Sequence, residues 1–268
     1  MLNVERNISP PMSLLHTPPN RPAGKSVQLM STCLCDAFYA DVAQATVEVL
    51  EFLGCDIELP DGQTCCGQPA FNGGDWASSR KVVRHTAKVF AGEKPIVVPS
   101  GSCAAMIFHG APLEFEKEAD LPVIQALANR TWELLDFIVF GLGVTEWPGK
   151  FDAKITVHRS CHLRGSKSPE AIATLLDSIE GLTVEPIDET EQCCGFGGTF
   201  AVSFPNISNS MGTLKIEKLT ACKPDIVAAA DMGCMMHFGG MMEKQGFPQK
   251  RMHVAQILRD SLKNASLL

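Results

Sequence analysis

The sequence predicts an α/β fold of two pseudo-symmetric, Rossmann-like units with parallel sheets, in which the cysteines lie at the carboxyl ends of the strands. Short apolar runs alternate along the chain with segments of helical periodicity, a pattern typical of parallel α/β sheets. Cys-Cys-Gly occurs twice, beginning at Cys65 and at Cys193, and a lone cysteine precedes each pair by 32 positions, at Cys33 and Cys161. A duplicated cysteine pattern indicates a duplicated unit.

The first unit reads as strand and helix in alternation. Val27–Met30 and Ile57–Leu59 are short apolar segments, and Pro95–Val98 is apolar enough to be buried on both faces. The spacing predicts a helix over Asp36–Leu53 that ends at Gly54, and a second helix that Asp75 caps and that continues to Phe90. Each framework cysteine then follows a predicted strand, where the ligands of parallel sheets collect.

The second unit repeats this plan. Predicted strands are Lys154–His158, Thr183–Ile187 and Pro224–Ala228; predicted helices run from Ser168 to Gly181, from Ile207 to Leu219, and onward from Met235. Between the units, Leu134–Val144 is apolar but too short to cross a bilayer, and predicts a core helix.

The predicted boundaries are a disordered leader over residues 1–25, a first domain over residues 26–145 and a second over residues 151–268. The leader has charges and prolines but no apolar signal-peptide region. The glycines and prolines of Trp132–Lys150 mark the boundary between the domains.

Composition excludes several function classes. The net charge is −7 without a basic block, so neither nucleic acid nor an anionic membrane is an expected partner. The chain is not expected to be an integral membrane protein, which leaves peripheral association open. The expected compartment is the cytoplasm, where clustered cysteines bind metal or do redox chemistry more often than they form disulfides.

The cysteines are therefore the candidate metal ligands, four to a unit, as a tetrahedral ion or a cubane cluster requires. The candidate set is Cys33, Cys65, Cys66 and Cys103 in the first unit and Cys161, Cys193, Cys194 and Cys234 in the second. Cys35, Cys55 and Cys222 have no counterpart in the other unit and read as small buried hydrophobic side chains. An odd total of 11 argues against complete disulfide pairing.

Other side chains near this set stay open as contributors. His158, His162 and His237 could each be a ligand, a proton relay or a structural histidine, and the structural role is favoured for each. Asp231 could be a ligand. Since neighbouring side chains of a strand alternate between faces, two adjacent cysteines can serve one site only from an irregular turn, which the following glycine permits.

The repeated spacing resembles that of the CCG, or cysteine-rich, domain family: a lone Cys, about thirty residues, Cys-Cys-Gly, and a final Cys-containing turn nearly forty residues later. The resemblance covers the chain from about Val27 onward. It implies that the eight candidate cysteines hold an iron-sulfur cluster, expected to be [4Fe-4S], with zinc as the alternative.

For a chain with two such units and little else, the resemblance implies an electron-transfer subunit, non-catalytic or co-catalytic, of a multi-protein system that oxidises L-lactate or another 2-hydroxy acid. Its expected partners are the other subunits, including an iron-sulfur protein with ferredoxin-type motifs, which this chain lacks. The related B subunit of heterodisulfide reductase ends its pattern in Cys-x-x-Cys, whereas this sequence has Ser100 and Asp231 at the first of those positions. That departure disfavours a non-cubane cluster and disulfide reduction.

Two other classes remain open from the residues. One is a structural zinc module, since four thiolates also suit Zn²⁺. The other is a thiol-redox protein in which Cys33 or Cys161 is a nucleophile, activated by a nearby positive charge such as Arg159 or Arg164.

Overall fold

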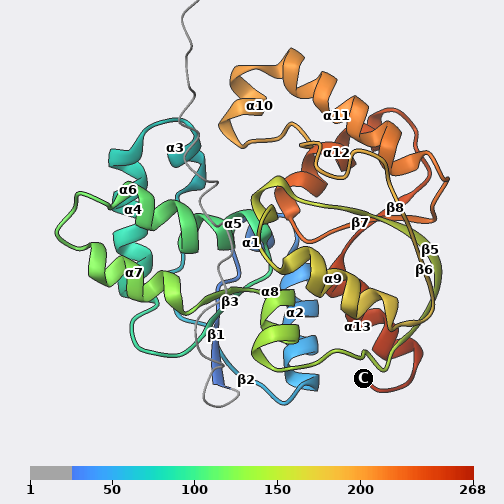
Figure 1. The fold of residues 1–268 in the computed structure, drawn as a ribbon, viewed down its shortest axis with the longest axis horizontal. Helices are drawn as coiled ribbons and strands as arrows, with labels where there is room; N and C mark the ends of the chain where they lie inside the picture. Colours follow the sequence, from blue (N-terminus) through green and yellow to red (C-terminus); the bar gives the residue numbers. More distant parts are fainter. Residues whose placement is uncertain (1–25) are drawn as a thin grey trace, which may run out of the picture.

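The computed structural model describes residues 26–268, and the predicted leader over residues 1–25 lies outside them. The described residues form two four-stranded sheets with the orders β2-β1-β3-β4 and β6-β5-β7-β8 (Figure 1). All strand pairs in both sheets are parallel. The second order repeats the first, with each strand displaced by four, which confirms the predicted α/β fold of two similar units.

The elements of unit one follow in chain order. They are β1 (Ser26–Leu29), α1 (Cys33–Ala37), α2 (Ala40–Phe52), β2 (Asp56–Glu58), α3 (Gln68–Asn72), α4 (Trp76–Val89), β3 (Ile96–Val98), α5 (Gly101–Ala105), the π-helical turn η1 (Met106–Gly110), α6 (Ala111–Glu114), α7 (Leu121–Asn129), β4 (Thr131–Glu133), α8 (Leu134–Asp136) and a second π-helical turn, η2 (Phe137–Gly141).

Unit two has a similar order. Its elements are β5 (Lys150–His158), the 3-10 turn η3 (Cys161–Leu163), α9 (Ser168–Asp177), β6 (Glu180–Glu185), α10 (Thr199–Ser203), α11 (Pro205–Thr220), β7 (Ile226–Ala229), α12 (Met232–Lys244), β8 (Lys250–His253) and α13 (Val254–Asn264).

Some sequence-based boundaries were wrong, and the reasons are local. The long helix expected from Asp36 is two helices, α1 and α2, because Phe38 and Tyr39 leave helical geometry at φ −138° and −130°. Helix α9 ends at Asp177, and Gly181 lies in β6 with a φ of +82°. Helix α12 begins at Met232, so Cys234 lies in its first turn and not before it.

Helix capping agrees with the sequence at two predicted positions. The Asp75 side chain accepts a hydrogen bond of 3.0 Å from the backbone N–H of Ser78 and begins α4. Gly54 has a φ of +76° after α2, a left-handed conformation that glycine adopts without steric cost. Asp75 therefore fixes where α4 begins, and Gly54 fixes where the chain turns from α2 into β2.

One hydrophobic core joins the two units. It includes Val27 and Val49 of unit one together with Ile155 and Leu175 of unit two. Trp147, from the segment between the units, packs in this core, and its indole N–H donates to Leu258 O at 3.2 Å and to Ser261 Oγ at 3.0 Å. The two sheets are therefore held in a fixed relation by buried side chains.

Helix α13 of unit two packs against α2 of unit one, and Figure 1 shows the two helices side by side. Ion pairs support this contact: Arg259 lies 2.6 Å from Asp41 and Lys263 lies 2.7 Å from Glu48. Arg259 is largely buried, which makes its pair less exposed to screening than a surface pair.

No helix among residues 26–268 combines the length and apolar character that crossing a membrane requires. The apolar run that begins at Leu134 forms α8 and η2, and both contribute buried side chains to the shared core. The predicted core role of this run is therefore confirmed.

Replacing Asp136 with asparagine is expected to stabilise the protein at neutral and alkaline pH. Asp136 is buried in α8, and burial raises the pKa of its carboxyl from 3.8 to about 7 despite a 2.9 Å hydrogen bond from Ser168 Oγ. Because the folded state binds this proton more tightly than the unfolded state, the wild-type loses stability as pH rises from about 4 to about 7, by up to about 1.4 kcal/mol per pH unit.

Urea unfolding at several pH values measures this effect. The free energy of unfolding of Asp136→Asn should rise relative to that of the wild-type as pH rises through that window. Asp177→Asn, on the exposed end of α9, is the control for the removal of one carboxylate. An equal pH slope in Asp136→Asn and wild-type would contradict the assignment.

Candidate metal centre

All eight candidate cysteines line one cavity, which we call the framework cavity. Its volume is about 220 Å³. The cysteines reach it from six turns, each of which follows a strand of one of the two sheets: Cys33, Cys65, Cys66, Cys103, Cys161, Cys193, Cys194 and Cys234. The sequence predicts that the carboxyl ends of parallel strands bring these thiols to one place, and the structure confirms this arrangement.

The unit-one cysteines differ in exposure. Cys33, the first residue of α1, is exposed, Cys65 and Cys103 are half-buried, and Cys66 is buried. Thr32, directly before Cys33, has a φ of +69°, a left-handed conformation that costs a β-branched residue about 1–3 kcal/mol. This strain at the cysteine turn is typical of a functional site.

The unit-two cysteines form two close pairs. Cys161 Sγ lies 3.8 Å from Cys193 Sγ, and Cys194 Sγ lies 3.2 Å from Cys234 Sγ. The first pair is half-buried and the second is buried.

Each Cys-Cys-Gly turn needs its glycine. Gly67 and Gly195 have φ of +95° and +91°, and a Cβ on Gly195 would lie 2.7 Å from Ser208 O. The backbone N–H of Gly67 donates to Cys65 Sγ at 3.5 Å, and that of Gly195 donates to Cys193 Sγ at 3.4 Å. Such N–H donors favour the thiolate form of a cysteine.

These donors and the neighbouring thiols make one cysteine in each unit strongly acidic. Hydrogen bonds from Cys161 and Cys194 lower the pKa of Cys193 to about 2, and the pKa of Cys65 is also lowered to about 2, with Cys33 as its principal donor. The pKa of Cys161 is raised because its thiol donates to Cys193 and because it is partly buried. In each unit the neighbouring donors therefore favour the thiolate form of the first cysteine of the Cys-Cys pair.

Asp231 connects the two halves of the site. Its Oδ1 accepts a 3.1 Å hydrogen bond from the backbone N–H of Cys234, and its Oδ2 accepts bonds from the N–H of Ser102 at 2.7 Å and the hydroxyl of Ser100 at 3.3 Å. Asp231 is 1% exposed. Both of its oxygens are thus engaged, and the structure gives it the role of a helix cap shared by α12 and α5.

His158, the last residue of β5, lies beside the unit-two thiols. It is buried, neither ring nitrogen has a hydrogen-bond partner among the described residues, and a ring nitrogen lies within 4.8 Å of the Sγ atoms of Cys194 and Cys234. Burial, with a contribution from Lys215, lowers the pKa of His158 to about 3. The imidazole is therefore neutral at physiological pH.

Lys215 is a residue of this site that sequence reasoning missed. It is completely buried in α11, and its ammonium donates to the backbone carbonyls of Glu189 at 3.5 Å and Thr190 at 3.4 Å. Burial lowers its pKa, while the unit-two cysteines, Cys194 foremost, act to raise it. No sequence signal marks this lysine, because a lysine in a helix is usually on the solvent face.

The other two candidate histidines have different surroundings. His162 Nδ1 lies 3.6 Å from Cys161 Sγ, on the rim of the framework cavity. His237 Nε2 lies 3.3 Å from both Ser208 Oγ and Ser208 O, a contact typical of a structural histidine.

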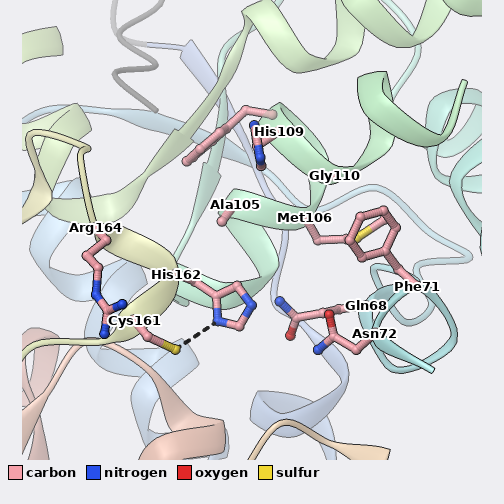
Figure 2. A pocket seen from close by; sticks show the side chains of 11 residues that line it. Gln68, Phe71, Asn72, Ala105, Met106, His109, Gly110, Cys161, His162 and Arg164 are labelled. Atoms are coloured by element: carbon pink, nitrogen blue, oxygen red, sulfur yellow. Dashed lines mark hydrogen bonds between the residues drawn. The ribbon is translucent and has the colours of Figure 1, made fainter. Parts of the chain in front are cut away.

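A second cavity of about 220 Å³ lies beside the first, and Figure 2 shows its lining. Cys161 and His162 line both cavities. The lining also includes the imidazole of His109 and the apolar ring of Phe71. A framework cysteine is therefore part of the wall of both cavities.

The three cysteines without counterparts lie outside the framework cavity. Cys35 and Cys55 are buried, and Cys35 packs with Val42 and Met232. Cys222 is half-buried. The prediction that these three are small buried hydrophobic side chains is confirmed for Cys35 and Cys55 and is wrong for Cys222.

The fold and the duplicated cysteine site define a CCG protein. The CCG cysteine-rich domain family matches residues 27–108 and 155–239, and this chain belongs to that family. Four thiolates gathered in each unit are a donor set suited to soft metal ions and iron-sulfur clusters.

Relatives align with most of the length of this chain. It is 41% identical over 243 residues to lactate utilization protein A of Exiguobacterium sp. (strain ATCC BAA-1283 / AT1b), an alignment that covers 90% of this chain and 99% of the relative. It is 43% identical over 241 residues to lactate utilization protein A of Geobacillus thermodenitrificans (strain NG80-2), covering 87% of this chain and 98% of the relative.

A solved structure shares the fold. A hypothetical protein from Helicobacter pylori superposes with a TM-score of 0.60 at 12% identity, covering 92% of this chain. This chain spans about half, 51%, of the length of that structure.

Proposed function

We propose that this chain is the iron-sulfur electron-transfer subunit of a multi-protein system that oxidises L-lactate. The observation that carries the proposal is the framework cavity, which presents eight cysteines in two matched sets of four. Lactate comes from the names of the relatives, which align along nearly their whole length with this chain.

Each unit would hold its cluster through its four framework cysteines. A bound cluster supplies one-electron transfer, at a potential that depends on hydrogen bonds to its sulfurs and on nearby charge. Two features of the site would influence this potential. The Gly67 and Gly195 N–H groups donate to cysteine sulfurs, and burial of Cys66 and Cys194 excludes water from one side of each set.

The electron count supports a role in 2-hydroxy acid oxidation. Conversion of a 2-hydroxy acid to a 2-oxo acid releases two electrons and two protons, and two one-electron sites take both electrons. The sequence has no dinucleotide fingerprint and no ferredoxin-type cysteine run. We therefore propose that the two sites pass the electrons on to a partner subunit. A reducing cytoplasm suits eight unpaired framework thiols.

Anaerobic purification followed by iron, sulfide and zinc analysis, with EPR before and after dithionite, tests the cofactor. Iron and acid-labile sulfide in matched amounts with a signal that dithionite changes are expected. Stoichiometric zinc without sulfide would overturn electron transfer.

The substrate is tested separately. In extract from cells that lack this chain, adding the purified protein is expected to restore L-lactate-dependent dye reduction, and a Cys66→Ser, Cys194→Ser double variant is not. Glycolate and D-lactate are the substrate controls. Restoration by glycolate but not by L-lactate would keep the electron-transfer role and reject the substrate.

A zinc module is the second candidate, and the spacing of one of the two thiol pairs favours it. A single Zn²⁺ with Zn–S bonds of about 2.3 Å separates tetrahedral thiolates by about 3.8 Å, close to the 3.8 Å between Cys161 and Cys193. A cubane would require the thiolates to move apart. The shared, open cavity favours clusters instead, because structural zinc sites are closed.

A thiol-redox role finds less support. The nucleophile candidates Cys33 and Cys161 have raised pKa values, chiefly because each donates a hydrogen bond to the first cysteine of the Cys-Cys pair. The guanidinium of Arg164 pairs with Glu191 at 2.6 Å, so its charge is already compensated.

A further inference from the structure

The two cysteine sets are matched, but the unit-two set has two buried nitrogen-bearing side chains near it, His158 and Lys215, in addition to the buried carboxylate of Asp231. His158 occupies the position after Val157 of β5, and the equivalent position after Leu29 of β1 is Met30. Both residues are buried. Unit two thus has the imidazole of His158, which can donate a hydrogen bond, at the position where unit one has the thioether of Met30, which cannot.

The imidazole has no other use within the described residues. Neither nitrogen of His158 is hydrogen-bonded there, and the ring packs edge-on against Phe238 with centroids 5.6 Å apart. A buried polar group without a partner is costly to fold. A ring nitrogen lies within 4.8 Å of the sulfurs of both Cys194 and Cys234, and these two cysteines line the framework cavity.

Lys215 strengthens the asymmetry. None of the ion pairs among residues 26–268 involves this buried ammonium, which is bound by backbone carbonyls instead. The buried residues of α4, which packs behind the unit-one Cys-Cys-Gly turn as α11 does in unit two, are Ser79, Val83 and Thr86, all uncharged.

We propose that His158 donates an N–H hydrogen bond to the sulfurs of the unit-two cluster and, together with Lys215, gives that cluster the higher reduction potential, so that electrons pass from unit one to unit two. Four cysteines already complete the ligand set, which leaves the imidazole as a donor. Adding an electron increases the negative charge of a cluster, and an N–H dipole and an ammonium both stabilise that charge. The inference rests on the proposed iron-sulfur function.

The test is an EPR-monitored redox titration of variants made in a Cys66→Ser background, which retains only the unit-two set. His158→Met, the residue that unit one carries, and Lys215→Met are each expected to lower the midpoint potential. A tenfold change in the ratio of reduced to oxidised cluster corresponds to 59 mV for a one-electron couple. The mirror-image control, Met30→His in a Cys194→Ser background, should raise the unit-one midpoint.

A second measurement needs no substitution at His158. With ¹⁵N-histidine, pulsed EPR of a reduced Cys66→Ser, His162→Gln protein, which lacks the histidine beside Cys161, should detect a histidine nitrogen coupled to the unit-two cluster, and no such coupling in the Cys194→Ser protein. Unchanged midpoints in both variants, with cluster content retained, would overturn the proposal, as would absence of the coupling.

The outcomes separate this inference from the function on which it rests. Zinc without sulfide in the purified wild-type overturns both. A potential shift in His158→Met with no L-lactate-dependent activity in the extract leaves the inference standing and rejects the substrate.

Discussion

Cys194→Ser is expected to halve the metal content of the purified protein, and to leave the EPR signal of unit one in place. Cys194 is 2% exposed and its Sγ lies 3.2 Å from that of Cys234, so no solvent ligand can easily replace it. Serine is a poorer ligand for a soft metal, so the unit-two site loses one of the four thiolates that would hold its metal.

The matched variant Cys66→Ser should remove the other half and leave the signal of unit two. Cys222→Ser, which changes a half-buried cysteine outside the framework cavity, is the control and should retain the full metal content. Loss of both signals from either single framework variant would contradict independent binding by the two sets.

Asp231→Ala is expected to lower the free energy of unfolding by about 3–5 kcal/mol and to deplete metal from both units. Its carboxylate accepts hydrogen bonds from Ser102 and Ser100 of unit one and from Cys234 of unit two. Removing it leaves buried donors without an acceptor, and each costs about 1–3 kcal/mol. Because both cysteine turns lose an anchor, one substitution should affect two sites.

Urea unfolding of the metal-free protein and metal analysis of the loaded protein measure the two effects. Asp177→Ala, at an exposed position of α9, should change neither. Asp231→Asn, which keeps one acceptor oxygen, should fall between wild-type and Asp231→Ala. Depletion confined to unit two, with unit one fully loaded, would show that Asp231 caps only its own helix.

Much of this architecture could be predicted because it depends on local patterns that occur twice. Apolar strands such as Ile96–Val98, the cap at Asp75 and the constant cysteine spacing each carry their own signal. Because each framework cysteine follows a predicted strand, the geometry of a parallel sheet predicts that the thiols converge at one edge. The outer strand β8 escaped prediction because Lys250–His253 is short and largely polar.

What escaped prediction at the site depends on contacts between distant segments. The role of Asp231 as a shared cap requires Ser100 and Ser102, which lie about 130 positions away in the sequence. His158 was given a structural role, and only its burial without a hydrogen-bond partner marks it as different. Lys215 has no motif, because its importance comes from the depth at which α11 places it.

The contact between α2 and α13 has a consequence for biosynthesis. A ribosome makes every strand of unit one before it makes α13, so the nascent first unit has α2 uncovered on the side that α13 later occupies. Contacts between segments so far apart in sequence form late and slowly. The packing of the first unit is therefore completed only after α13 has been made. A circularly permuted gene that places the α13 codons ahead of β1 should let unit one become resistant to protease earlier during translation.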